Sequence, residues 1–542
     1  MTRPWWRGAV FYQIYVRSFA DSNDDGVGDL PGITSRLDYV KSLGVDAIWL
    51  TPFYPSPQKD HGYDVAGYVD VNPEYGTLGD FDQLLRRAHQ LGLKVLVDIV
   101  PNHTSDQHPW FRAALASPDN PHRGRYHFAE GKPDGSPPNN WSSAFGGPAW
   151  TREEAGGQWY LHLFAPEQPD LNWWGPDVPV EFEAIIKFWL DRGADGFRID
   201  VASALFKRAD LADRPLIPNR ATGTLEPDPA FSIFDQPQLH DVYRRWRQIA
   251  GGYEPDRVLV GEIFEPRRHS TFVASDQLDM AFAFMQVPWD ATRWRRSIDT
   301  WRRALKPPGT EPSWTLSNHD VVRQVTRFGG GNLGLSRARA ALLLVLGLPG
   351  QVFFFQGEEL GLEEVNVPEE NRQDPVFLHS GGRNAGRDGC RVPLPWHRGL
   401  PNAGFSSPLV GKSPAPPGDG EPGLDTPPSP PWLPMPAGWD RYAVDAELAS
   451  SGSMLQHHRR ALVLRRRLAG QLPDRLEWCP APPAVLAYRR GRLVVACNFG
   501  RRPAGLLVGG RLLIASSPLV RHRRGRLMLP PSSAAWLDVS AS

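Results

Sequence analysis

Cysteine is scarce in this chain, and so are long apolar runs. Three cysteines, Cys390, Cys479 and Cys497, stand among 542 residues. They are too few for a disulfide framework, which favours a reducing, cytoplasmic location. The first residues lack the apolar run of a secretory signal peptide. No apolar run approaches the length of a membrane span, so we expect no membrane partner.

An excess of charge of either sign is also absent. Lys and Arg number 60, as do Asp and Glu, so the formal net charge is zero. This balance argues against a nucleic acid or an anionic surface as partner. Aromatic residues are plentiful instead, with 20 Trp and 13 Tyr. Their flat rings suit sugar faces, although most are expected in the core. The length predicts several structural units, and we expect a monomer or homodimer.

One short stretch, DSNDDGVGDL, alternates acidic residues with others. Oxygen ligands at alternate positions, with glycine at the sixth, form the first part of an EF-hand calcium loop. Here the twelfth position is Gly32 instead of Glu, and the preceding segment resembles a strand, which excludes an EF-hand. A polar turn and a structural Ca²⁺ or Mg²⁺ site remain. The candidate ligands are Asp21, Asn23, Asp25, Val27 through its carbonyl, and Asp29.

Short apolar runs alternate with helical patterns along most of the chain. Eight such runs, with helices ending in glycine between most of them, predict an α/β fold with a (β/α)8 TIM barrel. An open doubly wound sheet is the alternative, but its glycine-rich phosphate loop is absent after the first strand. The predicted strands are AVFYQIYV, DAIWL, KVLVDIV, GFRID, VLVGE, DMAFAF, WTLSNHD and QVFFFQGEE.

Two stretches interrupt this alternation and a third departs from it. Residues 104–172 are too long for a loop between a strand and a helix, and predict an inserted domain B after the third strand. Residues 399–438 form a Pro-rich insertion, expected to be an extended loop. Residues 473–542 contain short strands that predict a C-terminal antiparallel β-sandwich. The barrel then comprises residues 1–103 and 173–472.

Ionisable side chains follow the ends of the predicted strands, where barrel enzymes carry their chemistry. One Asp at a strand end is more often a helix cap than a catalyst. Several together, with basic neighbours, indicate a site instead. They are Asp98, Asn102 and His103 after the third strand, Arg198 and Asp200 at the fourth, Glu262 at the fifth, and His319 and Asp320 at the seventh.

Such a site suits glycoside hydrolysis. A retaining enzyme needs a carboxylate nucleophile and a carboxylic acid ~5–5.5 Å apart, with different pKa values. Arg198 and Asp200 point to the same side of their strand, so the guanidinium can keep Asp200 ionised as nucleophile. Glu262 has no basic neighbour in sequence, and a less polar setting would keep it protonated as the acid. Asp320 could bind hydroxyls and stabilise positive charge.

The motifs DIVPNH, GFRIDVA, VLVGE and SNHD, in that order, resemble those of glycoside hydrolase family 13, the α-amylase family. The likeness covers nearly the whole chain, including domain B and the C-terminal β domain. It implies Asp200 as nucleophile, Glu262 as general acid/base and Asp320 as transition-state stabiliser. It also implies that His103, Arg198 and His319 line the first sugar subsite.

Further motifs resemble the α-glucosidase and oligo-1,6-glucosidase group of that family. DHGYDVAGY implies Tyr63 as a stacking platform and Asp64 as a ligand of the terminal sugar. QPDLNWW resembles the group's marker at the end of domain B. In GRDGCRVPLPW, Arg387 matches the residue that partners the Asp64 position. Such a pair would close the inner end of a pocket for chain ends. In this group, Val201 tends to accompany acceptance of α-1,6 linkages.

The same resemblance implies that the loop with Asp21, Asn23, Asp25, Val27 and Asp29 holds a structural Ca²⁺ or Mg²⁺, away from the chemistry. The family's other calcium site uses the position of Asn102. The glucosidase group usually lacks that ion, so we do not predict it here.

The sequence therefore predicts a retaining, exo-acting α-glucosidase that removes terminal α-1,4- or α-1,6-linked glucose from short oligosaccharides or small α-glucosides. A trehalose synthase or another transglucosylase on the same barrel is one alternative, since only the exclusion of water differs. A non-catalytic relative is another. The transporter-associated relatives carry a membrane span and lose catalytic residues, whereas this chain has no such span and keeps all three carboxylates.

Overall fold

Eight parallel strands close into a barrel in this computed structural model, which describes residues 4–154, 157–218, 225–228, 231–234, 236–264, 266–305, 310–406 and 428–539. The barrel confirms the predicted α/β fold. Its strands are hydrogen-bonded in the order β1, β13, β12, β11, β10, β7, β3, β2. Their bounds are β1 (Val10–Ile14), β2 (Ala47–Leu50), β3 (Lys94–Ile99), β7 (Gly196–Ile199), β10 (Val258–Gly261), β11 (Met280–Phe284), β12 (Ser313–Thr315) and β13 (Gln351–Phe355).

The interior of the barrel is filled by large apolar side chains, so it is a packed core and not a channel. Phe11 and Phe353 stack with their ring centroids 4.3 Å apart, and Trp49 packs beside Phe282 at 5.5 Å. All four side chains are at most 1% exposed. Because side chains fill the interior of the barrel, a ligand can bind only at the ends of the strands.

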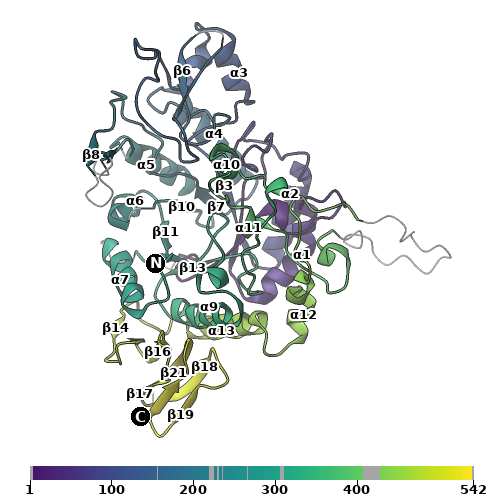
Figure 1. Cartoon of the computed structure of the whole chain (residues 1–542), viewed down its shortest axis with the longest axis vertical. Helices are drawn as coiled ribbons and strands as arrows, with labels where there is room; N and C mark the ends of the chain where they lie inside the picture. Colours follow the sequence, from purple (N-terminus) through teal and green to yellow (C-terminus); the bar gives the residue numbers. More distant parts are fainter. Residues whose placement is uncertain are drawn as a thin grey trace, which may run out of the picture.

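Helices surround the barrel (Figure 1). The principal ones are α1 (Leu30–Leu43), α2 (Leu78–Gln90), α4 (Asp177–Asp191), α5 (Leu239–Ala250), α7 (Ala291–Ala304), α9 (Gly331–Leu346) and α13 (Met454–Leu468). Their sequences show why they form. In α2, Phe81, Leu84, Leu85 and Ala88 are buried on one face, and Thr77 with Asp80 makes a capping box at the start.

Helix α1 shows how the first strand leads into the acidic loop. Asp29 caps this helix by accepting a hydrogen bond from the backbone N–H of Gly32, and a proline follows in the first turn. The acidic loop therefore lies between β1 and α1, and the segment before it is a strand, as the sequence predicts.

Domain B is a small unit above the barrel, with β6 and α3 at the upper end of Figure 1. It contains α3 (Pro109–Ala116) and a three-stranded sheet of β4 (Phe128–Ala129), β6 (Trp159–Leu161) and β5 (Trp150–Arg152). A separate hairpin, β8 (Leu216–Pro218) with β9 (Leu225–Pro227), lies between β7 and α5. Both follow barrel strands at their carboxyl ends, on the side of the predicted site.

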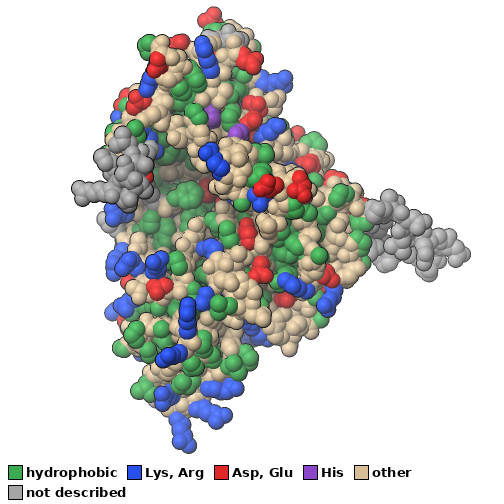
Figure 2. Space-filling view, in the orientation of Figure 1, with side chains coloured by type: hydrophobic (Ala, Val, Ile, Leu, Met, Phe, Trp, Pro, Cys, Tyr) green, Lys and Arg blue, Asp and Glu red, His purple; other side chains and the backbone are tan. Residues whose placement is uncertain are grey.

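The C-terminal β domain packs two sheets over a core of their own. One has the order β14 (Glu477–Trp478), β15 (Val485–Arg490), β16 (Leu493–Asn498), β21 (Ser533–Asp538), β18 (Arg511–Ala515). The other comprises β17 (Ala504–Leu507), β20 (Arg526–Leu529) and β19 (Arg521–Arg523). The first sheet is anchored to α9, where the Trp536 indole N–H donates to the Leu343 carbonyl at 2.8 Å. Basic side chains gather over this domain at the lower end of Figure 2.

Most of the Pro-rich insertion, residues 407–427, lies outside the described residues. Its described ends both meet the loop between β1 and α1. The backbone N–H of Asp21 donates to the Phe405 carbonyl at 3.0 Å, and that of Trp432 donates to the Gly26 carbonyl at 2.9 Å. No helix in the described part of the chain is long and apolar enough to cross a membrane.

Candidate active site

A cavity of about 220 Å³ lies at the carboxyl ends of the barrel strands, between the barrel and domain B. Eight of the ten side chains predicted for catalysis or substrate binding line it: Tyr63, His103, Asp200, Val201, Glu262, His319, Asp320 and Arg387. Arg198 lies beneath them, 1% exposed. Asp64 alone is elsewhere. Sequence reasoning missed Asp60, Phe145, Phe164, Phe264 and Val376 in the wall.

Arg198 is the centre of the first cluster in this cavity. Its Nη1 lies 2.7 Å from Asp200 Oδ1 and 3.0 Å from Asp98 Oδ1. Its Nη2 lies 2.7 Å from Glu262 Oε1. One guanidinium therefore holds three buried carboxyl groups, which come from the ends of β3, β7 and β10. We refer to these four residues as the Arg198 cluster.

The contact between Arg198 and Glu262 corrects the expectation that a less polar setting surrounds Glu262. Strands β7 and β10 are neighbours, and Arg198 is in register with Val260. The same guanidinium therefore reaches both Asp200 and Glu262, so Arg198 cannot be what separates their pKa values. The backbone N–H of Val201 also donates to Glu262 Oε2 at 3.2 Å.

Burial dominates the electrostatics of the Arg198 cluster. It raises the pKa of Asp98 to about 7, although Arg198 opposes the rise. Burial likewise raises the pKa of Asp200 and that of Glu262, and repulsion from neighbouring carboxylates adds to both. Since one cation faces three carboxyl groups, the surroundings favour a protonated carboxyl group in this cluster, and Asp200 and Glu262 titrate as a pair.

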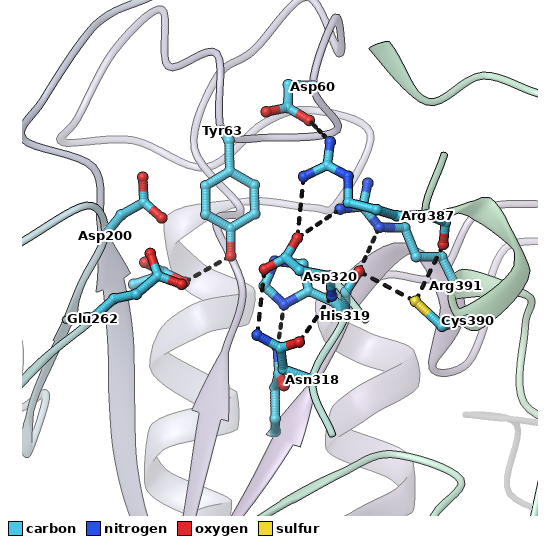
Figure 3. A network of polar contacts seen from close by, with 12 residues as sticks. Asp60, Tyr63, Asp200, Glu262, Asn318, His319, Asp320, Arg387, Cys390 and Arg391 are labelled. Carbon is cyan, nitrogen blue, oxygen red and sulfur yellow. Dashed lines mark hydrogen bonds and ion pairs between the residues drawn. The ribbon is translucent and has the colours of Figure 1, made fainter. Parts of the chain in front are cut away.

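Arg387 is the centre of a second cluster, visible to the right of Tyr63 in Figure 3. Its guanidinium makes a two-pronged contact with Asp374 at 2.9 Å on each prong. It also contacts Asp60 Oδ1 at 2.8 Å and Asp320 Oδ1 at 3.1 Å. Arg391 adds a second cation, with its Nη2 3.1 Å from the same oxygen of Asp320. We refer to these five residues as the Arg387 cluster.

The two arginines change the balance of charge in the Arg387 cluster. Burial would raise the pKa of Asp320, but the neighbouring His319 ring and the charges of Arg387 and Arg391 outweigh it and hold that pKa well below the usual range. The same arginines lower the pKa of Asp374 against its burial. For Asp60, burial outweighs Arg387 and raises the pKa. Asp320 and Asp374 are thus held ionised.

The prediction that Asp64 partners Arg387 is wrong, because Asp60 makes the contact with Arg387. Asp64 is 0% exposed and turns back into its own loop. It accepts hydrogen bonds from the Ser56 hydroxyl and from the backbone N–H groups of Lys59 and Asp60, at 2.8–2.9 Å. Asp64 thereby shapes the loop that presents Asp60 to Arg387. Gln168, from the QPDLNWW motif, holds the other oxygen of Asp60 at 3.1 Å.

Rings and histidines form the floor between the two clusters. Tyr63 stacks on His319 at 5.3 Å, nearly parallel, and its hydroxyl donates to Asp98 at 3.0 Å. The Gln13 amide contacts Nδ1 of His319 at 2.6 Å, and Nε2 lies 3.4 Å from Asp320. Burial lowers the pKa of His103 to about 4. His103 is therefore neutral near pH 7.

The opposite wall of the cavity is apolar and partly open. Phe264, two residues after Glu262, is 62% exposed and stacks on Phe284 at 5.3 Å. Val201 also lines this side. Its φ of +45° is unusual for a β-branched residue and marks local strain beside the site.

Asn102 does not line the cavity. Its side-chain oxygen accepts a hydrogen bond from Lys207 Nζ at 2.8 Å, and the same Nζ lies 2.8 Å from Asp170 Oδ2. Both charged groups are 0% exposed. A lysine ammonium thus already supplies the cation at this point, which gives a physical reason to expect no metal ion there.

The loop between β1 and α1 winds around Asp21. This carboxylate is buried and accepts backbone hydrogen bonds from Asn23 at 3.0 Å and Gly26 at 2.9 Å. Burial raises the pKa of Asp29, and the charge of Asp21 contributes. A divalent cation would relieve this repulsion, so the donor set fits a metal. Among the described residues, however, no group of three or more His, Cys, Asp and Glu could hold one, and the site stays a prediction.

Comparisons with known proteins agree with this geometry. Residues 13–410 match the model of the α-amylase catalytic domain, and residues 455–536 match a domain of unknown function, DUF3459. A probable alpha-glucosidase of Rhizobium meliloti is 39% identical, covering 92% of this chain and 89% of that protein. An oligo-1,6-glucosidase of Parageobacillus thermoglucosidasius is 34% identical, covering 86% and 84%.

A solved structure is similar along the entire chain. The crystal structure of the α-glucosyl transfer enzyme XgtA is 37% identical, with a TM-score of 0.88, and the match covers 99% of this chain and 100% of that one. Together with the family model and the curated relatives, this establishes that the chain belongs to the α-amylase family of glycoside hydrolases, in its α-glucosidase group.

Proposed function

We propose that this glycoside hydrolase is a retaining, exo-acting α-glucosidase that removes one terminal α-linked glucose at a time from short oligosaccharides or small α-glucosides. The observation that supports this most is the Arg387 cluster. Asp60 and Arg387 line the cavity, and Asp374 holds Arg387 from behind, so these linked charges would close its inner end. A chain end fits against such a wall, whereas the middle of a polysaccharide would need an open cleft.

The Arg198 cluster would carry out the chemistry. Asp200 would attack the anomeric carbon, while Glu262 donates its proton to the departing oxygen and later takes one from water. Both carboxyl groups are held by one planar guanidinium at 2.7 Å, which supports the short separation of a retaining pair. The raised pKa values of the cluster support the same division, because the mechanism needs one charged carboxylate and one neutral carboxylic acid.

The Arg387 cluster would bind the terminal glucose. Asp320 and Asp374 are held ionised by the arginines, and charge-assisted hydrogen bonds to sugar hydroxyls are the strong ones. Asp320 would also stabilise positive charge developing on the sugar ring. Tyr63 supplies a ring face for stacking, and neutral His103 and His319 supply further hydrogen-bonding groups. Asp60 replaces Asp64 in the recognition role that the family resemblance implies.

The departing part of the substrate would meet Val201 and Phe264. Phe264 offers an exposed ring face two residues from the proposed acid, which suits sugars joined through either linkage. We therefore propose that this side, and not the Arg387 cluster, distinguishes α-1,4 from α-1,6 bonds.

Transfer of glucose to another sugar is a second candidate. The observation that favours it is the likeness to XgtA, whose structure is described as that of an α-glucosyl transfer enzyme. The same glucosyl-enzyme would serve both reactions, with a sugar taking the place of water. Hydrolysis is our first proposal because the curated relatives at 34–39% identity are named as glucosidases.

We propose in addition a structural Ca²⁺ or Mg²⁺ held by Asp21, Asn23, Asp25, Asp29 and the Val27 carbonyl. The ion would offset the repulsion between buried Asp21 and Asp29 and stabilise the loop, without taking part in the reaction. A cytoplasmic location is supported by the three free cysteines. A monomer or homodimer remains our expectation.

Chromatography of the first products from maltoheptaose tests the proposed function. We expect glucose and maltohexaose to appear together, and starch to be a poor substrate. Maltotriose and maltotetraose as the first products would indicate an open cleft. Incubation with maltose alone measures the second candidate, because trisaccharides would accumulate if transfer outpaced hydrolysis.

A further inference from the structure

Trp432 follows the undescribed residues 407–427, and it contacts three elements that lead to the proposed glucose-binding cluster. Its ring lies 5.0 Å from that of His61 and 6.2 Å from that of Tyr15. Its carbonyl accepts a hydrogen bond from the Gln373 side chain at 2.7 Å. Arg17 stacks over the ring at 4.7 Å. The indole is thus enclosed from several directions.

His61, Gln373 and Tyr15 each adjoin a residue of the pocket or of the Arg387 cluster. His61 directly follows Asp60, and Gln373 directly precedes Asp374, so the ring and the backbone carbonyl of Trp432 contact the neighbours of two of the three carboxylates that hold Arg387. Tyr15 stacks on His319 at 5.6 Å. Trp432 therefore lies behind the floor and the inner wall of the cavity without lining it.

The rings of Tyr15 and His61, which face Trp432, are not fixed by side-chain hydrogen bonds to any described residue. Within the described residues, Tyr15 Oη and both ring nitrogens of His61 are buried without a hydrogen-bond partner. His61 also has a φ of +49°, which is uncommon for a residue with a Cβ. Packing against the indole therefore helps to hold the His61 ring, and with it the backbone that carries Asp60.

Trp432 itself is held from the other side. Its indole N–H donates to the Ser18 hydroxyl at 2.9 Å, and the backbone N–H of Ser429 donates to Asp24 at 3.2 Å. The peptide of Pro430 packs on Gly26, where an added Cβ would lie 2.2 Å from the Pro430 carbonyl oxygen. The end of the Pro-rich insertion is therefore fastened to the loop between β1 and α1.

We infer that Trp432 is a positioning residue for the terminal glucose, acting through His61 on Asp60 of the Arg387 cluster and through Tyr15 on His319. This rests on the proposed function of that cluster. Removing the indole would let Asp60 move relative to Arg387, and small misplacements of binding groups are costly. Binding of glucose should weaken, while the chemistry at the Arg198 cluster, once glucose is seated, should change little.

The test compares Trp432→Ala with Trp432→Phe and with the control Trp439→Ala. Trp439 is buried in the same segment, but its ring packs on Tyr442 at 5.7 Å and not on the pocket. For Trp432→Ala we expect the inhibition constant of glucose and the KM for maltose to rise about ten- to a hundredfold, with kcat reduced far less. Trp432→Phe, which keeps a ring, should restore most of the affinity.

Melting temperature separates positioning from stability. Both alanine variants should melt earlier, because each loses a large packed ring, but Trp439→Ala should bind glucose like the wild type. The inference is overturned if Trp432→Ala binds glucose within about twofold of the wild type, or if both alanine variants weaken binding equally. A wild-type enzyme that releases no glucose from any α-glucoside would instead refute the proposed function.

Discussion

The two arginine-centred clusters both combine arginines with buried carboxyl groups, but the ratio of the two differs. The Arg198 cluster sets three carboxyl groups around one guanidinium, whereas the Arg387 cluster sets three around a pair of arginines. In the first, burial prevails and the pKa values of all three carboxyl groups rise. In the second, the pKa values of Asp320 and Asp374 fall, although that of Asp60 rises. One further cation thus separates a cluster whose surroundings favour a proton from one that keeps two of its three carboxylates ionised.

The difference indicates how one cavity can both bind and react. A carboxyl group with a raised pKa can hold a proton and donate it to a departing oxygen. Fixed charges, in contrast, can hold hydroxyl groups in one orientation as long as the carboxylates stay ionised. The Arg198 cluster is therefore suited to bond breaking and the Arg387 cluster to recognition, and substitutions in each should affect different kinetic quantities.

The largest effect is expected for the proposed nucleophile. Asp200→Asn should lower kcat/KM by about 10⁴-fold or more for every α-glucoside, with circular dichroism unchanged. The glucose released first by the wild type should be the α-anomer, because two displacements at one carbon restore its configuration. Proton NMR of the early product checks this, and β-glucose appearing first would rule out the retaining assignment.

Substitution in the Arg387 cluster should lower kcat/KM by an intermediate factor that is the same for α-1,4- and α-1,6-linked substrates. Arg387→Ala removes a charge-assisted contact worth on the order of 2–4 kcal/mol, or roughly thirty- to a thousandfold in kcat/KM. The loss should be similar for maltose and isomaltose, since both present the same terminal glucose. Unequal losses for the two disaccharides would place Arg387 on the departing side.

A matched pair of aspartates sharpens this result. Asp60→Asn should weaken glucose binding, because Asp60 contacts Arg387 directly. Asp64→Asn should mainly lower the melting temperature, since Asp64 holds only its own loop. Kinetics and melting curves of both variants distinguish the two roles, and the reverse outcome would restore Asp64 as the sugar ligand.

The motifs at the strand ends identified the candidate catalytic carboxyls, because residues that follow parallel strands must meet at one end of a barrel. The choice between Asp60 and Asp64 could not be made this way. They lie four residues apart in one loop, and only the backbone path shows that Asp64 turns inward. Asp374 gave no sequence signal, and the contact of Glu262 with Arg198 depends on the register between two strands.

The fold was more predictable than the contacts. All eight predicted strands form the barrel. Helix α7 was not predicted. It buries only Ala291, Trp294, Ile298 and Trp301 among many arginines, so its apolar face is a narrow stripe and not a continuous run.

The clusters should also respond oppositely to pH in their contribution to stability. Asp98 has a folded pKa of about 7, above its usual value, so its protonated form favours folding and this stability is lost as pH rises from about 4 to 7. The folded pKa of Asp374 is lowered, so its contribution is present above about pH 4 and is lost as pH falls towards the folded pKa.

Melting temperatures of Asp98→Asn and Asp374→Asn against pH measure this contrast. Between pH 5 and 7, the melting temperature of Asp98→Asn should exceed that of the wild type by a few degrees. The reason is that about 1.4 kcal/mol of stability accompanies each pH unit of linked titration. The melting temperature of Asp374→Asn should fall furthest below that of the wild type near neutral pH and approach it in acid. Parallel curves for both variants would remove the electrostatic distinction between the clusters.

The smallest effect on activity is expected at the loop around Asp21, which is remote from both clusters. If it holds a metal, a chelator should lower the melting temperature by a few degrees while the KM for maltose changes little. Asp21→Ala should melt early with or without the chelator. An unchanged melting temperature in a sample shown to be metal-free would reject the ion.

The division of labour between the clusters is tested most directly by kcat/KM for two substrates, p-nitrophenyl α-glucoside and maltose, in Glu262→Gln and Arg387→Ala. The nitrophenolate departs without needing a proton, so Glu262→Gln should lose about 10²–10⁴-fold on maltose and far less on the nitrophenyl substrate. Arg387→Ala should lose equally on both, because it acts on the glucose they share. Equal losses for Glu262→Gln, or a loss in Arg387→Ala that depends on the departing group, would contradict the assignment of chemistry to the Arg198 cluster and recognition to the Arg387 cluster.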